Sequence, residues 1–329
     1  MKSPYTGKEM RQVFEKRTWK FRGEEFLYYH TAWHCEETGE QFTTDESDTA
    51  GFVQVTNQYR EKYGIPYTDE IIDVRQHYGF SASMMSKILG IGTNQYRLYE
   101  QGEVPSVSNG RLITLVMKPE VMKQMVAMAK NELDPNEYEK AMGKVQSVIS
   151  DEEVSKVTAY ETSRIFSSKR GRENGYAVIS LNRLKNILLY VLGKCNETWN
   201  TKMNKLLFYI DFLSYRQRGM AMTGLTYKAI EYGPVPDRWE RIYSEFPEVK
   251  QELRKKYDFY GSVLVPNAKA EQDLFSKEEL QIMDMVCSHF GNMSSREISS
   301  QSHQETAWIN HVSSHGNVSF DEAFTLNGI

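Results

Sequence analysis

The sequence predicts a multidomain α+β protein, because three kinds of pattern follow one another along its 329 residues. Residues 1–50 are rich in aromatic and β-branched side chains, which is typical of a small β-rich module. Short helical segments separated by glycines fill residues 51–119 and predict an all-α domain that contains a helix-turn-helix. Residues 120–175 read as a helical connector. Residues 176–329 combine strong helical periodicity with extended segments, as expected for a mainly helical α+β domain.

The composition narrows the class of protein. A net charge of −4 excludes a globally basic nucleic-acid coat but is compatible with a local basic patch. The three cysteines lie far apart, which is the pattern of neither a disulfide framework nor a metal cluster. No apolar run reaches the roughly 20 residues needed to cross a bilayer, and the polar start does not resemble a signal peptide. We therefore expect a cytoplasmic protein with no membrane partner and no cofactor.

Two short stretches of the N-terminal module, SPYTG and CEETG, share the spacing of zinc knuckles. Their four ligand positions are occupied by Ser3, Thr6, Cys35 and Thr38. Hydroxyl groups stay protonated and bind zinc poorly, so this set predicts no metal. His30 and His34 are the nearest substitute ligands, but the alternation of side chains along a strand places them on the face opposite Cys35.

Aromatic side chains offer this module another source of stability. Gly23 separates two strand-like stretches, RTWKF and EEFLYYHTAWHC. Their dense aromatic set is Trp19, Phe21, Phe26, Tyr28 and Trp33. Because a buried ring contributes roughly 1.5–3 kcal/mol, we expect an aromatic core to replace the metal. Residues 1–50 are then a degenerate zinc-ribbon-like module.

Residues 81–102, SASMMSKILGIGTNQYRLYEQG, carry the helix-turn-helix pattern. Ser81 is a suitable N-cap for the first helix, the Gly-Ile-Gly sequence at 90–92 predicts the turn, and Thr93 is expected to cap the second helix. The start of that second helix faces the major groove in this motif. The candidate DNA-binding residues are Ser81, Thr93, Asn94, Gln95 and Arg97. Tyr96, with Leu98 or Tyr99, is expected to face the core.

The chemistry of these residues suits DNA recognition. Asn and Gln can bond the adenine edge, Arg the guanine edge, and a Thr methyl group can contact thymine. One such unit reads few bases, so we expect a homodimer on a palindromic double-stranded operator. A small helical bundle with an ordinary polar surface remains the alternative interpretation.

The first 120 or so residues resemble the MqsA-type antitoxins. The matching features are the start Met1-Lys2-x-Pro4, the sequence Cys35-Glu36-Glu37, the acidic run at 45–48 and the signature GIGTNQYRLYEQG. That family joins a zinc-binding module to an Xre-like helix-turn-helix, which dimerises and binds the operator of its own operon. The resemblance places the family's base-reading Asn at Asn94. Leu98 stands where the family has its second base-contacting residue, an Arg. Arg97 is therefore a candidate for a phosphate contact, and the operator sequence need not match that of the family.

A helix of the connector carries an unpaired apolar stripe. Asp134 is the expected N-cap, and Pro135 occupies the first helical position. The stripe consists of Tyr138, Met142, Val145 and Ile149. It requires a partner, which is either the neighbouring domain or a second copy of the chain.

Three motifs stand out in residues 176–329, namely KMNKLLFYIDFLSY, AIEYGPVPDRW and SHQETAW. Together they resemble the SocA-type antitoxin domain, also called Panacea, although Met203 replaces its usual Leu. The resemblance implies a domain that binds and neutralises a protein toxin. The candidate toxin-binding residues are Lys202, Asn204, Lys205, Tyr209, Glu231, Tyr232, Gly233, Pro234, His303, Glu305 and Trp308.

Simpler interpretations remain open for each motif. An exposed basic and aromatic face is expected on the helix around residues 202–218, where it is either a binding face or merely solvated. Its members are Lys202, Lys205, Tyr209, Arg216 and Arg218. The stiff turn at 231–236 can simply connect a strand to a helix capped by Asp237. His303 and Glu305 lack a neighbouring nucleophile in the sequence, which favours a structural pair over an acid–base pair.

These patterns favour the antitoxin of a type II toxin–antitoxin system, which neutralises a cognate toxin through its C-terminal domain and regulates its own operon through the helix-turn-helix. The alternative is a stand-alone transcriptional regulator whose C-terminal domain senses a ligand or a partner. An enzyme is disfavoured, because the sequence has no phosphate loop, metal cluster, nucleophile elbow or carboxylate dyad at recognisable spacing.

Overall fold

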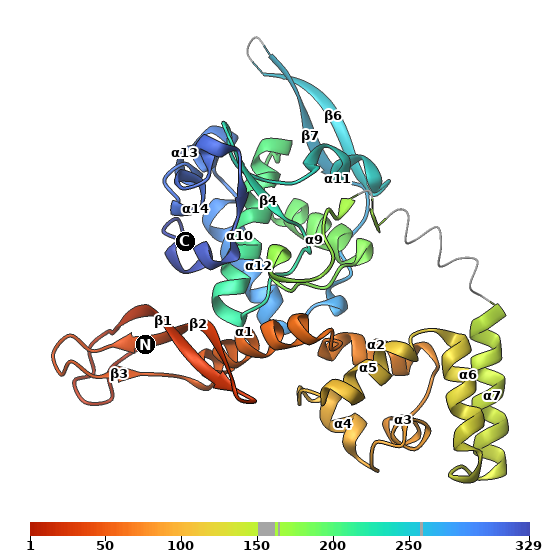
Figure 1. Cartoon of the computed structure of the whole chain (residues 1–329). Coiled ribbons are helices and arrows are strands. Elements are labelled where there is room, and N and C mark those ends of the chain that lie inside the picture. Colours follow the sequence, from red (N-terminus) through yellow and green to blue (C-terminus); the bar gives the residue numbers. More distant parts are fainter. Residues whose placement is uncertain (151–161, 164, 257–258) are drawn as a thin grey trace. The chain divides into compact units, whose positions relative to one another are not determined.

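A computed structural model describes residues 1–150, 162–163, 165–256 and 259–329 of the chain. The chain divides into two compact units, one formed by residues 1–55 with 161–329 and the other by residues 56–160. The predicted α+β class is confirmed, because an N-terminal sheet is followed by a helical region and then by helices with small sheets (Figure 1). Residues 151–161 and 164 of the predicted connector lie outside the described residues.

The N-terminal sheet is a long antiparallel hairpin with a short third strand. β1 (Arg11–Phe21) pairs along its full length with β2 (Glu24–His34), which also pairs with β3 (Gln41–Phe42). Arg22 and Gly23 have positive φ angles of 50° and 86°. Positive φ at both central residues is typical of two-residue hairpin turns, which explains the turn predicted at Gly23.

Aromatic residues on both faces of this hairpin connect it to other elements of its unit. Trp19 and Tyr28 pack edge to face over α1 (Asp45–Tyr63), where a Cβ added to Gly51 would lie 3.1 Å from the Tyr28 ring. On the other face, the Tyr29 ring stacks on Phe324 with centroids 4.2 Å apart. Of the five residues of the predicted aromatic core, only Phe26 is fully buried.

The second unit is a helical domain around one apolar core. Its helices are α2 (Thr68–His77), α3 (Ala82–Leu89), α4 (Gln95–Glu100), α5 (Val107–Leu115), α6 (Pro119–Met128) and α7 (Pro135–Ser150). The apolar stripe of α7 packs within this core, where Val145 is buried and Tyr138, Met142 and Ile149 are partly buried. The partner of the stripe is therefore the helical domain itself.

The C-terminal part of the first unit surrounds a central helix, α10 (Asn200–Arg218) (Figure 1). Its helices are α9 (Leu181–Lys194), α10 (Asn200–Arg218), α11 (Trp239–Glu245), α12 (Lys277–Phe290), α13 (Ser295–Ser302) and α14 (Thr306–Ile309). β4 (Tyr227–Ile230) lies between β5 (Gly233–Pro236) and β8 (Asn317–Val318) in one antiparallel sheet. β6 (Val249–Lys256) and β7 (Phe259–Pro266) form a separate hairpin. The predicted caps Ser180 and Ser276 accept hydrogen bonds from the backbone N–H groups of Arg183 and Glu279.

None of the helices in the described part of the chain is long and apolar enough to cross a membrane.

Candidate functional site

Helix α10 is buried on all sides. Every residue from Lys202 to Tyr215 is buried, and the exposed fractions of Lys202, Lys205 and Tyr209 are 1 %, 0 % and 0 %. The expectation of an exposed basic and aromatic face around these residues is therefore wrong. The physical reason is that each polar head group finds a protein partner, which offsets the cost of removing it from water.

The two lysines bind backbone carbonyl groups from other segments. Lys202 Nζ donates to the carbonyl oxygens of Asn196 and Gly291, at 2.6 and 2.7 Å. Lys205 Nζ donates to the carbonyl oxygen of Pro234 at 2.9 Å. Burial lowers the pKa of both side chains, and that of Lys205 falls to about 7. The lysines thus tie α10 to the end of α12 and to β5.

Asp211 is a buried carboxylate that the sequence patterns did not predict as a site residue. Its Oδ1 accepts the backbone N–H groups of Met222 and Thr223, each at 2.8 Å. Its Oδ2 accepts the hydroxyl of Tyr227 at 2.7 Å and that of Thr223. Burial raises the pKa of Asp211, and these hydrogen bonds oppose the rise. The available signal was an acidic residue inside the apolar run YIDFL.

Two further polar residues of the first motif also face inwards. Asn204 Oδ1 accepts the hydroxyl of Tyr243 at 2.5 Å. The Tyr209 hydroxyl donates to Glu305 Oε1 at 3.1 Å, and Glu305 also accepts the backbone N–H groups of Asn327 and Gly328. Glu305 is therefore a structural carboxylate, which joins α10 to the segment that follows residue 325. The sequence favoured such a structural role, although it predicted His303 as the partner.

The Tyr-Gly-Pro-Val turn lies directly over Lys205. Gly233 has a φ of 102°, and a Cβ added there would lie 2.7 Å from both Lys205 Cε and Ser302 Oγ. Only glycine fits this position without strain or collision. The predicted Asp237 cap is wrong, because its carboxylate pairs with Lys228 at 2.9 Å and Arg238 precedes the first turn of α11 with a φ of 59°.

The exposed part of the motif is a small surface, here called the turn surface. It consists of Glu231, Tyr232, His303 and Trp308. Tyr232 is 66 % exposed. The His303 and Trp308 rings stack with centroids 4.2 Å apart, and Trp308 Nε1 donates to the carbonyl oxygen of Ile230 at 2.7 Å. His303 Nε2 has no hydrogen-bond partner among the described residues, and burial lowers the pKa of this imidazole.

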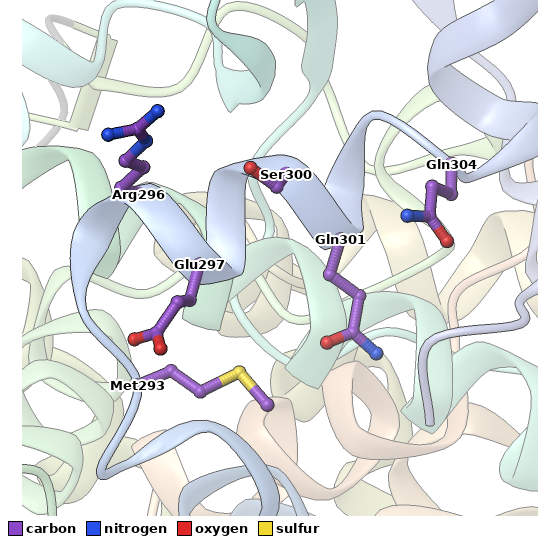
Figure 2. Close-up of a pocket in the computed structure, with 6 residues that line it drawn as sticks. All are labelled: Met293, Arg296, Glu297, Ser300, Gln301 and Gln304. Atoms are coloured by element: carbon purple, nitrogen blue, oxygen red, sulfur yellow. The ribbon is translucent and has the colours of Figure 1, made fainter.

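A shallow hollow of about 520 Å³ lies along α13. Its lining consists of Met293, Arg296, Glu297, Ser300, Gln301 and Gln304. Figure 2 shows Met293, Glu297 and Gln301 on one side of the helix, with Arg296 pointing away from them. Gln301 Nε2 donates to the Gly328 carbonyl at 2.8 Å, so this side chain fastens the same segment that Glu305 holds.

The helix-turn-helix residues lie at the surface of the other unit. Ser81 Oγ accepts the N–H of Met84 at 3.1 Å, as predicted for an N-cap. Thr93 does not cap the second helix, because Gln95 N donates to the Gly92 carbonyl and α4 begins only at Gln95. Asn94 occupies the cap position and makes no side-chain cap hydrogen bond.

The side chains of α4 divide into buried and exposed sets. Tyr96 and Tyr99 are buried, whereas Leu98 is 41 % exposed. Thr93, Asn94 and Arg97 are exposed, and the Gln95 amide donates to Glu103 Oε1 at 3.1 Å. The structure therefore leaves three of the predicted DNA-binding residues of this turn and helix open to solvent.

The two knuckle-like stretches form matching turns. In one, Ser3 N–H donates to the Lys8 carbonyl and Gly7 N–H to the Ser3 carbonyl. In the other, the corresponding bonds join Cys35 with Glu40 and Gly39 with Cys35. The two turns meet, because the Thr6 hydroxyl lies 3.9 Å from Cys35 Sγ.

Hydroxyl groups surround the single thiol of this site. Hydrogen bonds from the Ser3 and Thr38 side chains lower the pKa of Cys35 to about 6. One thiolate and three hydroxyls do not fit zinc, which requires thiolate, imidazole or carboxylate ligands. The described residues contain no cluster of three or more His, Cys, Asp or Glu side chains arranged for a metal ion.

Comparison with known proteins identifies the C-terminal part of the chain. Residues 203–309 match the family model described as antitoxin SocA-like, Panacea domain. No curated protein and no solved structure matches the chain. The match includes α10 from its fourth residue, the Tyr-Gly-Pro-Val turn and the segment with Glu305 and Trp308. The similarity to the SocA-like Panacea antitoxin domain thus covers residues 203–309, and that family is generally non-enzymatic.

Proposed function

We propose that this chain is the antitoxin of a type II toxin–antitoxin system and that its C-terminal domain binds and neutralises a cognate protein toxin. The observation that carries the proposal is the antitoxin-family match of residues 203–309. The internal hydrogen bonds of that region support it, because they account for the buried motif residues as the framework of one folded domain.

The turn surface is the part of the motif that we assign to toxin contact. Glu231 and Tyr232 are exposed, and His303 and Trp308 are partly exposed beside them. Aromatic residues are enriched at the energetic centres of protein interfaces. The remaining candidates act indirectly by holding this surface in place. They are Lys202, Asn204, Lys205, Tyr209, Gly233, Pro234 and Glu305.

We further propose that residues 51–119 bind operator DNA as a homodimer. Exposed Thr93 and Asn94 directly before the second helix, and exposed Arg97 within it, support this assignment. Residues 1–50 act as a degenerate MqsA-like module in this scheme, and α6 and α7 of the predicted connector pack into the core of the helical domain. The matching turns at Ser3 and Cys35 support this ancestry, since they keep the two-knuckle arrangement without its metal ligands.

Co-expression tests the antitoxin role. Each gene next to this one is expressed alone and together with the full chain, and growth is measured. We expect one neighbour to be toxic alone and harmless in the presence of this chain. The variant Tyr232→Ser should weaken that protection, whereas Met285→Ser, at an exposed position of α12, should not. If no neighbour is toxic, or if toxicity persists beside the wild-type chain, the antitoxin proposal is wrong and a stand-alone regulator is favoured.

A further inference from the structure

The β6–β7 hairpin extends from the C-terminal domain as a two-stranded arm (Figure 1). Its base is anchored, because Leu264 N donates to the Thr198 carbonyl at 2.8 Å and Val263 pairs with Trp199. Val263 and Leu264 are buried at this base. Beyond the base, the described residues of both strands are largely exposed to solvent.

Two large apolar side chains of the arm are among the most exposed of the chain. Leu253 is 72 % exposed and Tyr260 is 64 % exposed. A two-stranded ribbon is marginally stable unless something covers one of its faces. Exposed apolar residues on such a ribbon also favour unwanted association of edge strands. Keeping both residues exposed therefore carries a cost that a binding role would offset.

The pairing register places these residues on one face. Leu253 pairs with Ser262, and Lys255 pairs with Tyr260. Directly paired residues share a face, and alternate pairs along a hairpin return to that face. Leu253, Lys255 and Tyr260 therefore lie together, and we name this set the arm face. Lys255 Nζ lies 6.0 Å from the centroid of the Tyr260 ring and has no ion pair among the described residues.

The opposite face of the arm carries Lys250, Glu252 and Arg254, and the last two form an ion pair. Arg254 donates two hydrogen bonds to Glu252 Oε2, at 3.2 and 2.6 Å. This pair occupies the only carboxylate of β6. On the arm face, Lys255 lies beside Leu253 and Tyr260 and has no carboxylate partner among the described residues.

We infer that the arm face is a second contact for the cognate toxin and that it fits an apolar patch bordered by a carboxylate. This inference rests on the proposed antitoxin function. Charge complementarity assigns the carboxylate to Lys255, and the exposed Leu253 and Tyr260 supply the apolar contact. Nucleic acid is a poorer match, because phosphate contacts gain little from an exposed leucine.

The test uses the full chain and the neighbouring toxin that it neutralises. Affinity is measured by calorimetry for Leu253→Ser with Tyr260→Ser, and separately for Lys255→Glu. We expect the double variant to bind about tenfold or more weakly, as at interface positions that carry binding energy. The Lys255→Glu loss should shrink as salt concentration rises. Met285→Ser and Lys277→Glu make the same kinds of change at exposed positions of α12, and these controls should bind like the wild type.

The possible outcomes distinguish a failure of the proposed arm contact from a failure of the proposed antitoxin function. Arm variants that bind the toxin as tightly as the wild type would overturn the role of the arm alone. A wild-type chain that neutralises no neighbour would overturn both the function and the arm. Weaker binding of the variants to DNA or RNA with unchanged toxin affinity would also overturn the inference and assign the arm to nucleic acid. Restoration of Lys255→Glu binding by an acidic-to-lysine change in the toxin would support it directly.

Discussion

Helices α4 and α10 each carry a sequence motif. The polar residues of the α4 motif are mostly exposed, whereas those of the α10 motif are buried. In the region of α4, Thr93, Asn94 and Arg97 are open to solvent while the tyrosines face the core. In α10, the polar motif residues are themselves in the core, and each holds a backbone or side-chain group from another segment. The α4 motif is presented to solvent, whereas the α10 motif holds the C-terminal domain together.

This difference changes what a substitution should do. Removing a buried polar residue leaves its partners without hydrogen bonds and costs stability. Removing an exposed polar residue should leave stability nearly unchanged and affect only binding.

The largest effect is expected for Asp211→Ala. The substitution leaves two backbone N–H groups and the hydroxyls of Thr223 and Tyr227 without their acceptor. We expect a loss of about 3–5 kcal/mol in the free energy of unfolding, measured by urea denaturation. The exposed Asp273→Ala is the matched control and should change little. A loss below about 1 kcal/mol for Asp211→Ala would mean that the buried network contributes little.

Lys205→Met should change the pH dependence of stability. Burial lowers the pKa of folded Lys205 to about 7, whereas an unfolded lysine titrates near ~10.4. Between these values the unfolded chain binds one more proton, so this residue makes stability rise with pH from about 7 to ~10 and adds no slope below that window.

In the wild type, Lys205 should make the free energy of unfolding rise by up to about 1.4 kcal/mol per pH unit. We expect Lys205→Met to remove this rise, measured by urea unfolding at pH 7 to 9.5. Near pH 7 the variant should be about as stable as the wild type, because it removes a buried charge but leaves the Pro234 carbonyl without its donor. The exposed Lys277→Met should keep the wild-type slope, and an unchanged slope in Lys205→Met would exclude Lys205 as its source.

The smallest effect on stability is expected for the double variant Asn94→Ala with Arg97→Ala. Both side chains are exposed, so the free energy of unfolding should change by less than about 0.5 kcal/mol. Binding to a fragment of the chain's own promoter should nevertheless weaken by at least about tenfold, because a base contact contributes about 1–3 kcal/mol of discrimination. Asn136→Ala with Lys140→Ala, both exposed on α7, should retard the fragment like the wild type. Equal retardation by all three proteins would reject α4 as the recognition helix.

Local signals allowed much of the fold to be predicted from the sequence. The caps at Ser81, Ser180 and Ser276 and the hairpin turn at Gly23 depend on neighbouring residues only, and they agree with the structure. The burial of Lys202 and Lys205 could not be predicted in this way. Their partners are carbonyl groups up to 89 residues away along the chain, so a helix that looks amphipathic in sequence is interior in the fold.

The same limit applies to the candidate site. Sequence similarity identified the Tyr-Gly-Pro-Val turn and His303 with Trp308, but it did not separate the exposed Tyr232 from the buried Glu305. The Thr93 cap failed for a different reason. The chain needs Thr93 and Asn94 to complete the turn after Gly92, whose φ is 88°, before helical geometry can begin.

The burial of α10 determines which residues can be changed to alter the binding partner of this domain without unfolding it. The helix that identifies the domain in sequence presents none of its residues from Lys202 to Tyr215 to the outside. Its sequence therefore describes the scaffold and says little about partner choice. A library that randomises Tyr232, Leu253 and Tyr260 while keeping α10 constant should yield stable domains with altered partners. Randomising α10 itself should mainly yield domains that do not fold.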